Sequence, residues 1–399
     1  MKYATTAAIL TCAAIAFSSC TQHHHYGKEE KKAASPIVKS EQQEKIDTVI
    51  KLRDQGVFTD AEAKAKIDQI LGLNKPVPTS PAPAPVKAVA AAPSAPVANS
   101  NMDLNLAVYK PAQMLSGKLI SIGSDSMDRM MEMWEKKFRG HHPSLDFSHE
   151  GKGSSTATPA LIEGRSNVGP MSRAFKSSEI AKFENQFGYK PVQVRVAVDS
   201  LAIYIHPSNP LAKSGLTLAQ ADTIFSADRL RGGKQVKTWG DLGLSGEWAN
   251  KPIKVYSRNT ASGTFGFFKK KLCLKGNFKE SNIQLESSEE VVQAVAKDKF
   301  AVGFSGIAFN SPSVATLPLA EQKGAEFVAP NEISALSGSY PITRSLYVSY
   351  NLKPSGIDNL QKEFIKFVYS RTGQSIVRKD GYFPVNAMVA KQELSKLQL

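Results

Sequence analysis

The sequence predicts an α/β protein of two lobes, preceded by a short helical hairpin and a disordered linker. Its 399 residues exceed one typical domain, which leaves room for two lobes. From Lys118 onward, short apolar runs alternate with amphipathic stretches, the pattern of an open α/β sheet. Before that point, residues 75–100 are rich in Pro, Ala and Ser, a composition that disfavours packing and forms extended tethers. We therefore expect a tether ahead of a globular part.

Composition indicates a basic, globular protein. Hydrophobic residues make up 42% of the chain and charged residues 22%, which is enough apolar material for a packed core. The formal net charge of +14 favours anionic partners. The sequence contains no zinc-finger spacing, no RNA-recognition aromatic motif and no long basic block, so we expect no nucleic-acid partner. Beyond the N-terminus no apolar run reaches about 18 residues, and no membrane-spanning helix is expected.

The N-terminus has the features of an export signal, assigned to residues 1–19. Lys2 precedes an apolar stretch, residues 3–17, that is too short to span a membrane. The Ser-Ser-Cys sequence ending at Cys20 resembles a lipoprotein signal, in which the cysteine is lipidated and becomes the first mature residue. Phe17 stands where that pattern prefers Leu, so cleavage without lipid is the alternative. We expect export to the periplasm or cell envelope, with a lipid anchor at Cys20.

Three segments follow the signal. Residues 20–40 form a polar tail whose three histidines, residues 23–25, lack the further ligands that a metal site needs. Residues 41–73 place apolar side chains at helical spacing on both sides of Gly56, which predicts a helical hairpin similar to the short modules called SHOCT. Residues 74–116 are assigned to the Pro- and Ala-rich linker.

Three loops of the globular part share one design: a short apolar strand, a turn rich in Gly, Ser and Thr, and an amphipathic helix. The turns are Gly123–Ser126, Gly153–Thr156 and Ser262–Thr264. Such a turn directs backbone N–H groups and hydroxyls to the helix N-terminus, where the helix dipole favours an anion. Arg258 precedes the third turn at the end of its strand and adds a fixed positive charge. Together these features predict a multidentate anion site.

We expect neither catalysis nor a cofactor. The Gly-Lys-Gly sequence at residues 151–153 departs from the P-loop order, and residues 303–306 miss the nucleophile elbow by one position. The Met and Trp stripe from Met127 to Phe138 is assigned to the core, not to a cofactor site. Cys273 is expected to be a buried, unpaired side chain. The enzyme alternative, a phosphate-ester hydrolase, needs a metal cluster or an activated nucleophile, and neither pattern is present.

From about Lys118 to about Asn386 the chain resembles the substrate-binding proteins of phosphate ABC transporters. The matching stretches are LTLAQADTIFSADRLRGGKQVKTWGDLG (216–243), KPIKVYSRNTASGTFGFF (251–268), KFAVGFSGIAF (299–309), YPITRSLYVSYN (340–351) and FIKFVYSRTGQSIVRKDGYFPV (364–385). The resemblance implies a type II periplasmic binding protein (Venus-flytrap) fold, in which two crossing strands join two lobes around a ligand cleft. The expected binding domain is 117–390, with lobe 1 from 117–199 and 336–390, lobe 2 from 200–335, and a C-terminal tail at 391–399.

The resemblance also implies a set of phosphate ligands from both lobes. These residues are Ser124, Asp125, Ser154, Ser155, Ser172, Arg258, Ser262, Gly263 and Thr264. Arg258 would supply the charge and a bidentate fork, while hydroxyls and helix-start N–H groups would disperse the remaining charge without a second cation. Arg173 lies next to Ser172 in the sequence.

One departure from the family pattern affects selectivity. Many members place an Asp two residues after the arginine to accept the proton of hydrogen phosphate, and here that residue is Thr260. The first turn instead contains Asp125, where Thr or Ser is more usual. Two interpretations stay open: Asp125 accepts the ligand's proton, or it caps the following helix.

The sequence therefore predicts an exported solute-binding protein that captures inorganic phosphate and delivers it to the permease subunits of an ABC transporter. Two alternatives remain. The first is an envelope lipoprotein that senses phosphate or has a structural role without transport, which the N-terminal extension motivates. The second is a receptor for another oxyanion such as sulfate.

Overall fold

The computed structural model describes residues 103–399. The predicted signal peptide, Cys20, the helical hairpin and most of the predicted linker lie outside the described residues. Within 103–399, every helix is too short or too polar to cross a membrane.

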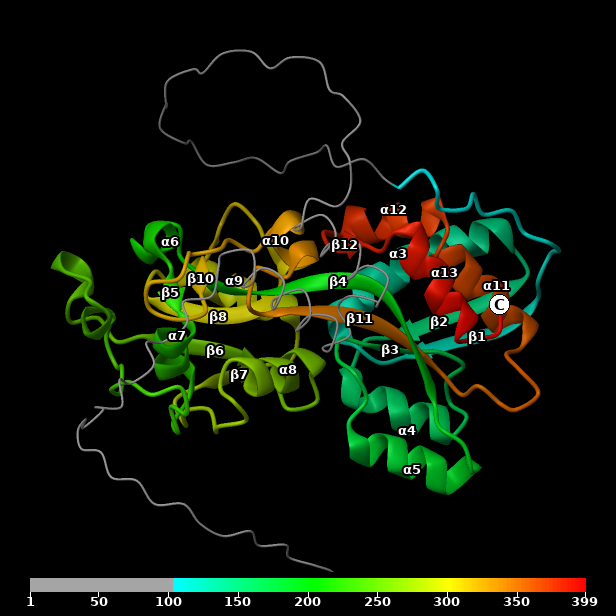
Figure 1. The fold of residues 1–399 in the computed structure, drawn as a ribbon, viewed down its shortest axis with the longest axis horizontal. Helices are drawn as coiled ribbons and strands as arrows, with labels where there is room; N and C mark the ends of the chain where they lie inside the picture. The colour runs from blue at the N-terminus through cyan, green and yellow to red at the C-terminus, as the bar shows by residue number, and fades with distance from the viewer. Residues whose placement is uncertain (1–102) are drawn as a thin grey trace, which may run out of the picture. The chain divides into compact units, whose positions relative to one another are not determined.

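Helices and strands alternate along the described chain (Figure 1). The first elements are β1 (Gly117–Ile122), η1 (Asp125–Met127), α3 (Asp128–His141), β2 (Leu145–Glu150), η2 (Ser154–Thr156), α4 (Ala157–Ile162), β3 (Gly169–Met171), α5 (Ser177–Phe187) and β4 (Val192–Ile205), where η marks a 3-10 turn. The middle elements are α6 (Leu211–Ser214), β5 (Leu216–Thr217), α7 (Leu218–Phe225), η3 (Trp239–Leu242), η4 (Gly246–Trp248), β6 (Lys254–Arg258), α8 (Gly263–Lys271), β7 (Ile283–Leu285), α9 (Ser288–Lys297), β8 (Ala301–Gly306), η5 (Ile307–Phe309), β9 (Ala315–Thr316) and β10 (Leu319–Ala320). The last elements are α10 (Glu332–Ser337), β11 (Thr343–Tyr350), α11 (Asn359–Val368), α12 (Arg371–Asp380), β12 (Phe383–Pro384) and α13 (Ala387–Ser395).

Strand β4 is the longest strand and belongs to two groups of strands. Its first part pairs antiparallel with β11, and its second part pairs antiparallel with β8. The order across the sheet is β3-β11-β4-β8-β6-β7, with β12 and β9 also paired to β4. The change of partner falls between Ser200, opposite Thr343, and Leu201, opposite Gly306. The chain returns beside this point, where Leu201 N donates to Ile342 O at 2.9 Å.

Two main hydrophobic cores lie on either side of this change of partner. One contains the stripe of α3 together with side chains of β1, α11 and α12, and its buried residues lie up to Ala197 and from Leu346 onward. The other runs from Leu201 to Ile342. We call the parts around these cores lobe 1 and lobe 2. The expected boundary at 199/200 coincides with the change of partner in β4, whereas the expected boundary at 335/336 lies inside α10.

Burial confirms the side chains assigned to the core. All five apolar residues of the α3 stripe are at most 1% exposed, namely Met127, Met130, Met131, Trp134 and Phe138. Cys273 is buried and unpaired. The stripe was predictable because a helix that buries one face repeats its apolar side chains every three to four residues.

The structure corrects two expected boundaries. Residues 103–116 are not part of a linker, because Leu106, Tyr109 and Leu115 are buried in the core of lobe 1 and Tyr109 Oη bonds His142 Nε2 at 2.8 Å. The expected tail at 391–399 includes the end of α13, and Leu397 is 1% exposed. Composition did not reveal either segment because each is short and packs against residues distant in sequence.

Candidate functional site

The first loop follows β1 and is held by hydrogen bonds to β2 and β3. Gly123 N donates to Glu150 O at 2.9 Å, and Ser124 N donates to Pro170 O at 2.8 Å. Gly123 has no room for a side chain, since a Cβ there would lie 2.1 Å from Pro170 O. The loop therefore holds Ser124, which is 1% exposed, at a fixed place beside β3.

The second loop contacts both the first loop and lobe 2. Gly153 has φ +109°, a conformation that favours glycine, and its N–H donates to Gly123 O at 2.7 Å. Ser155 N donates to Ala261 O in lobe 2 at 3.2 Å. Ser154 Oγ accepts from Ser172 N at 3.0 Å and lies 3.1 Å from Ser172 Oγ. The structure thus brings the predicted serines of the second loop together with Ser172.

The third loop meets these serines from lobe 2. Ser262 is the N-cap of α8, and its Oγ accepts from Thr264 N at 3.1 Å and Phe265 N at 3.4 Å. These two helix-start N–H groups were expected to face the ligand, but in this structure Ser262 occupies them. Gly263 lies directly against the hydroxyls of Ser154 and Ser172, because a Cβ on Gly263 would be 2.2 and 2.5 Å from their Oγ atoms.

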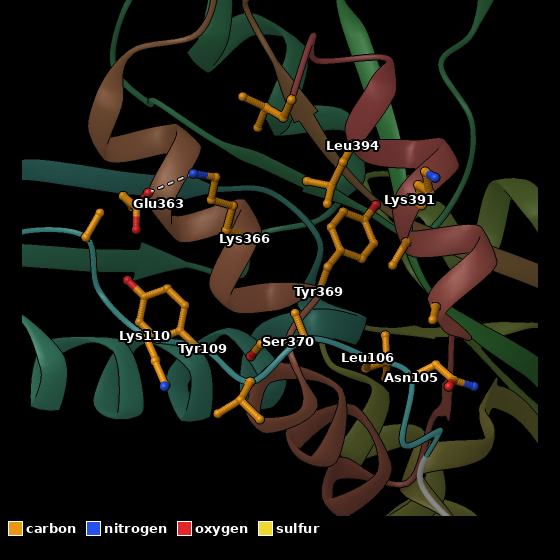
Figure 2. A pocket seen from close by; sticks show the side chains of 16 residues that line it. Asn105, Leu106, Tyr109, Lys110, Glu363, Lys366, Tyr369, Ser370, Lys391 and Leu394 are labelled. Carbon is orange, nitrogen blue, oxygen red and sulfur yellow. Dashed lines mark hydrogen bonds and ion pairs between the residues drawn. The ribbon is translucent and has the colours of Figure 1, made fainter.

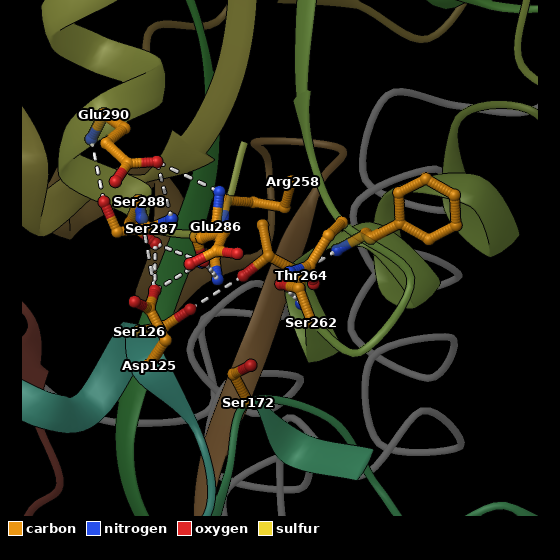
Figure 3. A network of polar contacts seen from close by, with 12 residues as sticks. Asp125, Ser126, Ser172, Arg258, Ser262, Thr264, Glu286, Ser287, Ser288 and Glu290 are labelled. Carbon is orange, nitrogen blue, oxygen red and sulfur yellow. Dashed lines mark hydrogen bonds and ion pairs between the residues drawn. The ribbon is translucent and has the colours of Figure 1, made fainter. Parts of the chain in front are cut away.

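Arg258 ends β6 and is 1% exposed. Its Nη1 donates to the Asp125 carboxylate of lobe 1 and to Ser288 Oγ at 2.7 Å, and its Nη2 donates to Glu286 O (Figure 3). Burial lowers the pKa of Arg258, and the neighbouring Asp125 carboxylate opposes that shift. The Nε atom is buried and has no hydrogen-bond partner within residues 103–399.

Asp125 joins the lobes instead of capping its own helix. Besides Arg258, its Oδ2 accepts from Ser288 N at 3.2 Å and Ser288 Oγ at 2.9 Å, at the N-terminus of α9. The turn before α3 has Ser124 as N-cap, without a capping bond from its side chain. The capping interpretation of Asp125 is therefore wrong for the helix that follows it. The alternative, acceptance of the ligand's proton, remains a prediction.

A second polar chain crosses between the lobes through Thr264. Its Oγ1 lies 2.8 Å from Ser126 Oγ and accepts from Arg344 Nη2 at 3.0 Å. Arg344 is paired with Asp199, with Nη2 at 2.7 Å from Oδ2. Arg344 is therefore a second cation, besides Arg258, in contact with a predicted ligand residue. We had expected the site to contain no second cation.

Sequence reasoning missed three residues of this network: Ser126, Ser288 and Arg344. Ser126 is part of the same turn as Ser124 and Asp125. Ser288 follows Ser287, whose pattern with Glu290 is a recognisable capping box. Arg344 lies in a stretch that carried the family resemblance. Because it is distant along the chain from the three turns, its contact with Thr264 could not be predicted from the sequence.

Arg173 is not free to act as a further cation. Its two terminal nitrogens bind the Glu179 carboxylate at 2.7 and 2.6 Å, and Nη2 also reaches Ser155 Oγ at 3.5 Å. This bidentate pair compensates the charge of Arg173 inside lobe 1. Ser155 is accordingly held from two sides, by Arg173 and by Ala261.

Two further observations limit the chemistry of the described residues. Within 103–399 there is no group of three or more His, Cys, Asp or Glu side chains that could hold a metal ion. A separate cavity of about 500 Å³ lies in lobe 1 between residues 105–112, α11 and α13 (Figure 2). Tyr109, Lys366 and Lys391 line it, and none of the nine predicted ligand residues does.

The fold and this site together define a class of protein. Two α/β lobes are joined by crossing strands, and hydroxyls, a buried arginine and helix starts from both lobes meet at one place, as in a two-lobed binding protein for a small anion. Residues 91–372 match the model of the PBP superfamily domain.

Relatives identify the family. The chain is 47% identical over 300 residues to the phosphate-binding protein PstS of Pseudomonas aeruginosa, covering 75% of this chain and 92% of that protein. It is 26% identical to PstS of Staphylococcus haemolyticus, covering 71% and 86%. The chain belongs to the phosphate-binding protein PstS family within the PBP superfamily.

Solved structures agree on the fold. A substrate-binding protein of a phosphate ABC transporter from Clostridium perfringens, crystallised with bound phosphate, has a TM-score of 0.57 at 24% identity and covers 68% of this chain and 100% of its own. An ABC-type phosphate transport receptor from Vibrio cholerae has a TM-score of 0.53 at 22% identity and covers 67% and 100%.

Proposed function

We propose that the chain is an extracytoplasmic receptor that captures inorganic phosphate between its lobes and delivers it to an ABC permease. The observation that carries the proposal is the convergence on buried Arg258 of polar loops from both lobes, in a chain of the PstS family. The relatives are named phosphate-binding proteins, and the Clostridium perfringens structure is that of a substrate-binding protein of a phosphate ABC transporter.

The loops suit a tetrahedral oxyanion. Arg258 provides a planar fork of donors, and one of them, Nε, is still available. The hydroxyls of Ser124, Ser154 and Ser172 can rotate to donate to phosphate oxygens. Ser155, Ser262, Gly263 and Thr264 bring the backbone of both lobes to the same place. A ligand held from both sides favours the arrangement in which the lobes are together.

Asp125 gives the site its preference for a protonated oxyanion. All its contacts named above use Oδ2, which leaves Oδ1 to accept the proton of hydrogen phosphate. Sulfate carries no such proton at neutral pH and would place its oxygen against the carboxylate. Thr260 stands where other members carry this acidic group, so Asp125 of lobe 1 takes over the role.

The chain binds its ligand without turnover, since the site offers hydrogen-bond donors for an anion and its relatives are named phosphate-binding proteins. The N-terminal signal and Cys20 place the receptor at the cell envelope on a lipid anchor, and the segment between them and the binding domain holds it off the membrane. Labelling with a radioactive fatty acid, compared between the wild type and Cys20→Ala, tests the anchor.

Isothermal titration of the purified chain with phosphate and with sulfate tests the function. We expect a 1:1 exothermic binding of phosphate and at least about a hundredfold weaker binding of sulfate, a difference of about 2.7 kcal/mol. The absence of heat with phosphate would contradict the proposal. Tighter binding of sulfate than of phosphate would show that the protein is a sulfate receptor. A phosphatase assay on the same sample should show no turnover.

A further inference from the structure

We propose that Arg344 is a second oxyanion-binding arginine, placed on the strand that returns between the lobes. This inference rests on the proposed function and adds a residue to its site. Arg344 lies near the start of β11 and is 2% exposed, so its charge is held inside the protein. Burial of an arginine is costly unless its donors are satisfied, and the fate of each donor is therefore informative.

Two residues, Asp199 and Thr264, accept from the Nε and Nη2 atoms of Arg344. Nε donates to Asp199 Oδ2 at 2.8 Å, and Nη2 lies 2.7 Å from the same oxygen. Nη2 also donates to Thr264 Oγ1 at 3.0 Å. The Nη1 atom is buried and has no partner within residues 103–399. An unpaired charged donor in such a place points to an acceptor that binds there.

A second buried guanidinium shows the same deficit nearby. Arg258 Nε is also buried without a partner among the described residues. The two guanidiniums are close enough for the charge of Arg344 to lower the pKa of Arg258, although burial is the larger cause. Asp125 and Asp199 pair with the charges of the two arginines, but Arg258 Nε and Arg344 Nη1 have no acceptor within residues 103–399. A tetrahedral oxyanion supplies acceptors for both of these buried donors.

Thr264 links Arg344 to the predicted ligand residues. Its Oγ1 contacts Arg344 on one side and Ser126 of lobe 1 on the other. Thr264 is the second residue of α8, directly after Gly263, which packs against Ser154 and Ser172. Arg344 is therefore in direct contact with the turn that brings lobe 2 to the serines of lobe 1.

The place of Arg344 in the fold couples ligand binding to the connection between lobes. Asp199 lies opposite Arg344 in the pairing of β4 with β11, next to the residues where β4 changes partner. Asp199 Oδ1 accepts from Ile307 N of lobe 2 at 3.0 Å. An oxyanion that binds Arg344 would thus act on the two strands that connect the lobes.

The competing explanation is a plain buried ion pair that holds the crossing strands. Arg195 provides a matched control, because it lies on β4, the strand that pairs with β11, is 4% exposed and pairs with buried Glu393 at 3.4 Å. None of the predicted ligand residues contacts this pair in the bonds described above. Arg344→Lys and Arg195→Lys each keep a positive charge but lose the planar set of donors.

The test is isothermal titration of phosphate into the full chain and both variants, with a thermal melt of each. We expect Arg344→Lys to raise the Kd for phosphate at least about tenfold, because one charge-assisted hydrogen bond is lost. Arg195→Lys should change the Kd less than about twofold. Wild-type affinity in Arg344→Lys would overturn the inference. Absence of phosphate binding by the wild type would instead contradict the proposed function.

A second measurement does not depend on the variant folding. The guanidinium resonances of Arg344 in the wild-type chain, assigned through bonds, should shift and exchange more slowly with water when phosphate is added. Those of Arg195 serve as the internal control and should stay unchanged. A structural ion pair has no reason to respond to the ligand, so unchanged Arg344 resonances in a phosphate-saturated sample would refute a direct contact.

Discussion

Gly263 lies where the two lobes touch, and its missing side chain makes the contact possible. A Cβ there would be 2.2 Å from Ser154 Oγ and 2.9 Å from Ser154 Cβ, closer than packed atoms approach. Gly266, one turn further along α8, has Arg173 Cδ as the nearest neighbour of such a Cβ at 4.0 Å. The same helix therefore contains a crowded glycine and an uncrowded one.

Gly263→Ala should weaken phosphate binding by at least about tenfold, because the added methyl group pushes the third loop away from Ser154 and Ser172. Gly266→Ala adds the same group to the same helix, where it should improve helix propensity by about 0.5–1 kcal/mol without affecting affinity. Titration calorimetry and thermal melts of both variants measure these effects. Equal affinities for the two variants would show that the contact does not matter for binding.

Asp125→Asn should reduce the preference for phosphate over sulfate by at least about tenfold. The amide can donate a hydrogen bond and cannot repel sulfate as a carboxylate does, so sulfate gains while phosphate loses its proton acceptor. Competition titrations with the two anions give the ratio. Asp128→Asn, at the start of α3, is the control because its carboxylate is half-exposed and is not bonded to Arg258. A ratio that stays the same in Asp125→Asn would remove Asp125 from this role.

Lys279 gives the folded domain a measurable pH dependence. Burial lowers its pKa from the ordinary value of 10.5 to about 8, while its Nζ donates to Val236 O. Between these two pH values the unfolded chain binds a proton that the folded chain has lost, so the free energy of unfolding rises with pH. We expect a rise of about 1–2 kcal/mol between pH 8 and 10.5 in the wild type relative to Lys279→Met, measured by urea unfolding; this is less than the full shift would give, because solvent screens the partly exposed ammonium group. Parallel pH curves for the two proteins would contradict the shift.

Elements with regular internal patterns were predictable from the sequence, and elements held by distant contacts were not. The stripe of α3 and the start of a helix at the Ser262–Thr264 turn follow local rules, so both were correctly expected. The segment around Leu106 and the end of α13 have no such pattern, because their order comes from packing against lobe 1. The same limit applies to the site: the turns were recognisable, whereas the contact of Arg344 with Thr264 arises from the fold alone.

The end of α13 should contribute to stability as a core element. Leu397→Ala removes a side chain that is 1% exposed and should lower the free energy of unfolding by about 2–4 kcal/mol. Met388→Ala, in α13 and 50% exposed, should change it by less than about 0.5 kcal/mol. Urea unfolding of both variants makes the comparison. If residues 391–399 were a free tail, the two substitutions would have similarly small effects.

At the scale of the whole domain, the site is shared between two cores that are built from different parts of the chain. Asp125 and Ser126 of lobe 1 bond Arg258 and Thr264 of lobe 2, so each lobe supplies one partner of each contact. Charge pairing across the lobes supports their association without a ligand, and a bound anion adds contacts on both sides. Contacts in both lobes should therefore contribute to the free energy of phosphate binding.

Hydrogen exchange followed by mass spectrometry tests this distribution. Phosphate at about a hundred times its Kd stabilises the folded protein by about 2.7 kcal/mol. Under this condition hydrogen exchange should slow both in peptides covering residues 153–155 of lobe 1 and in peptides covering residues 262–264 of lobe 2. Arg258→Ala should abolish both effects at the same phosphate concentration, because it removes the main charge that holds the anion. Peptides covering Leu106 and Leu397 report on the core of lobe 1 away from the site and should change little. Protection confined to one lobe would mean that phosphate binds to that lobe alone, and the site would then not be shared.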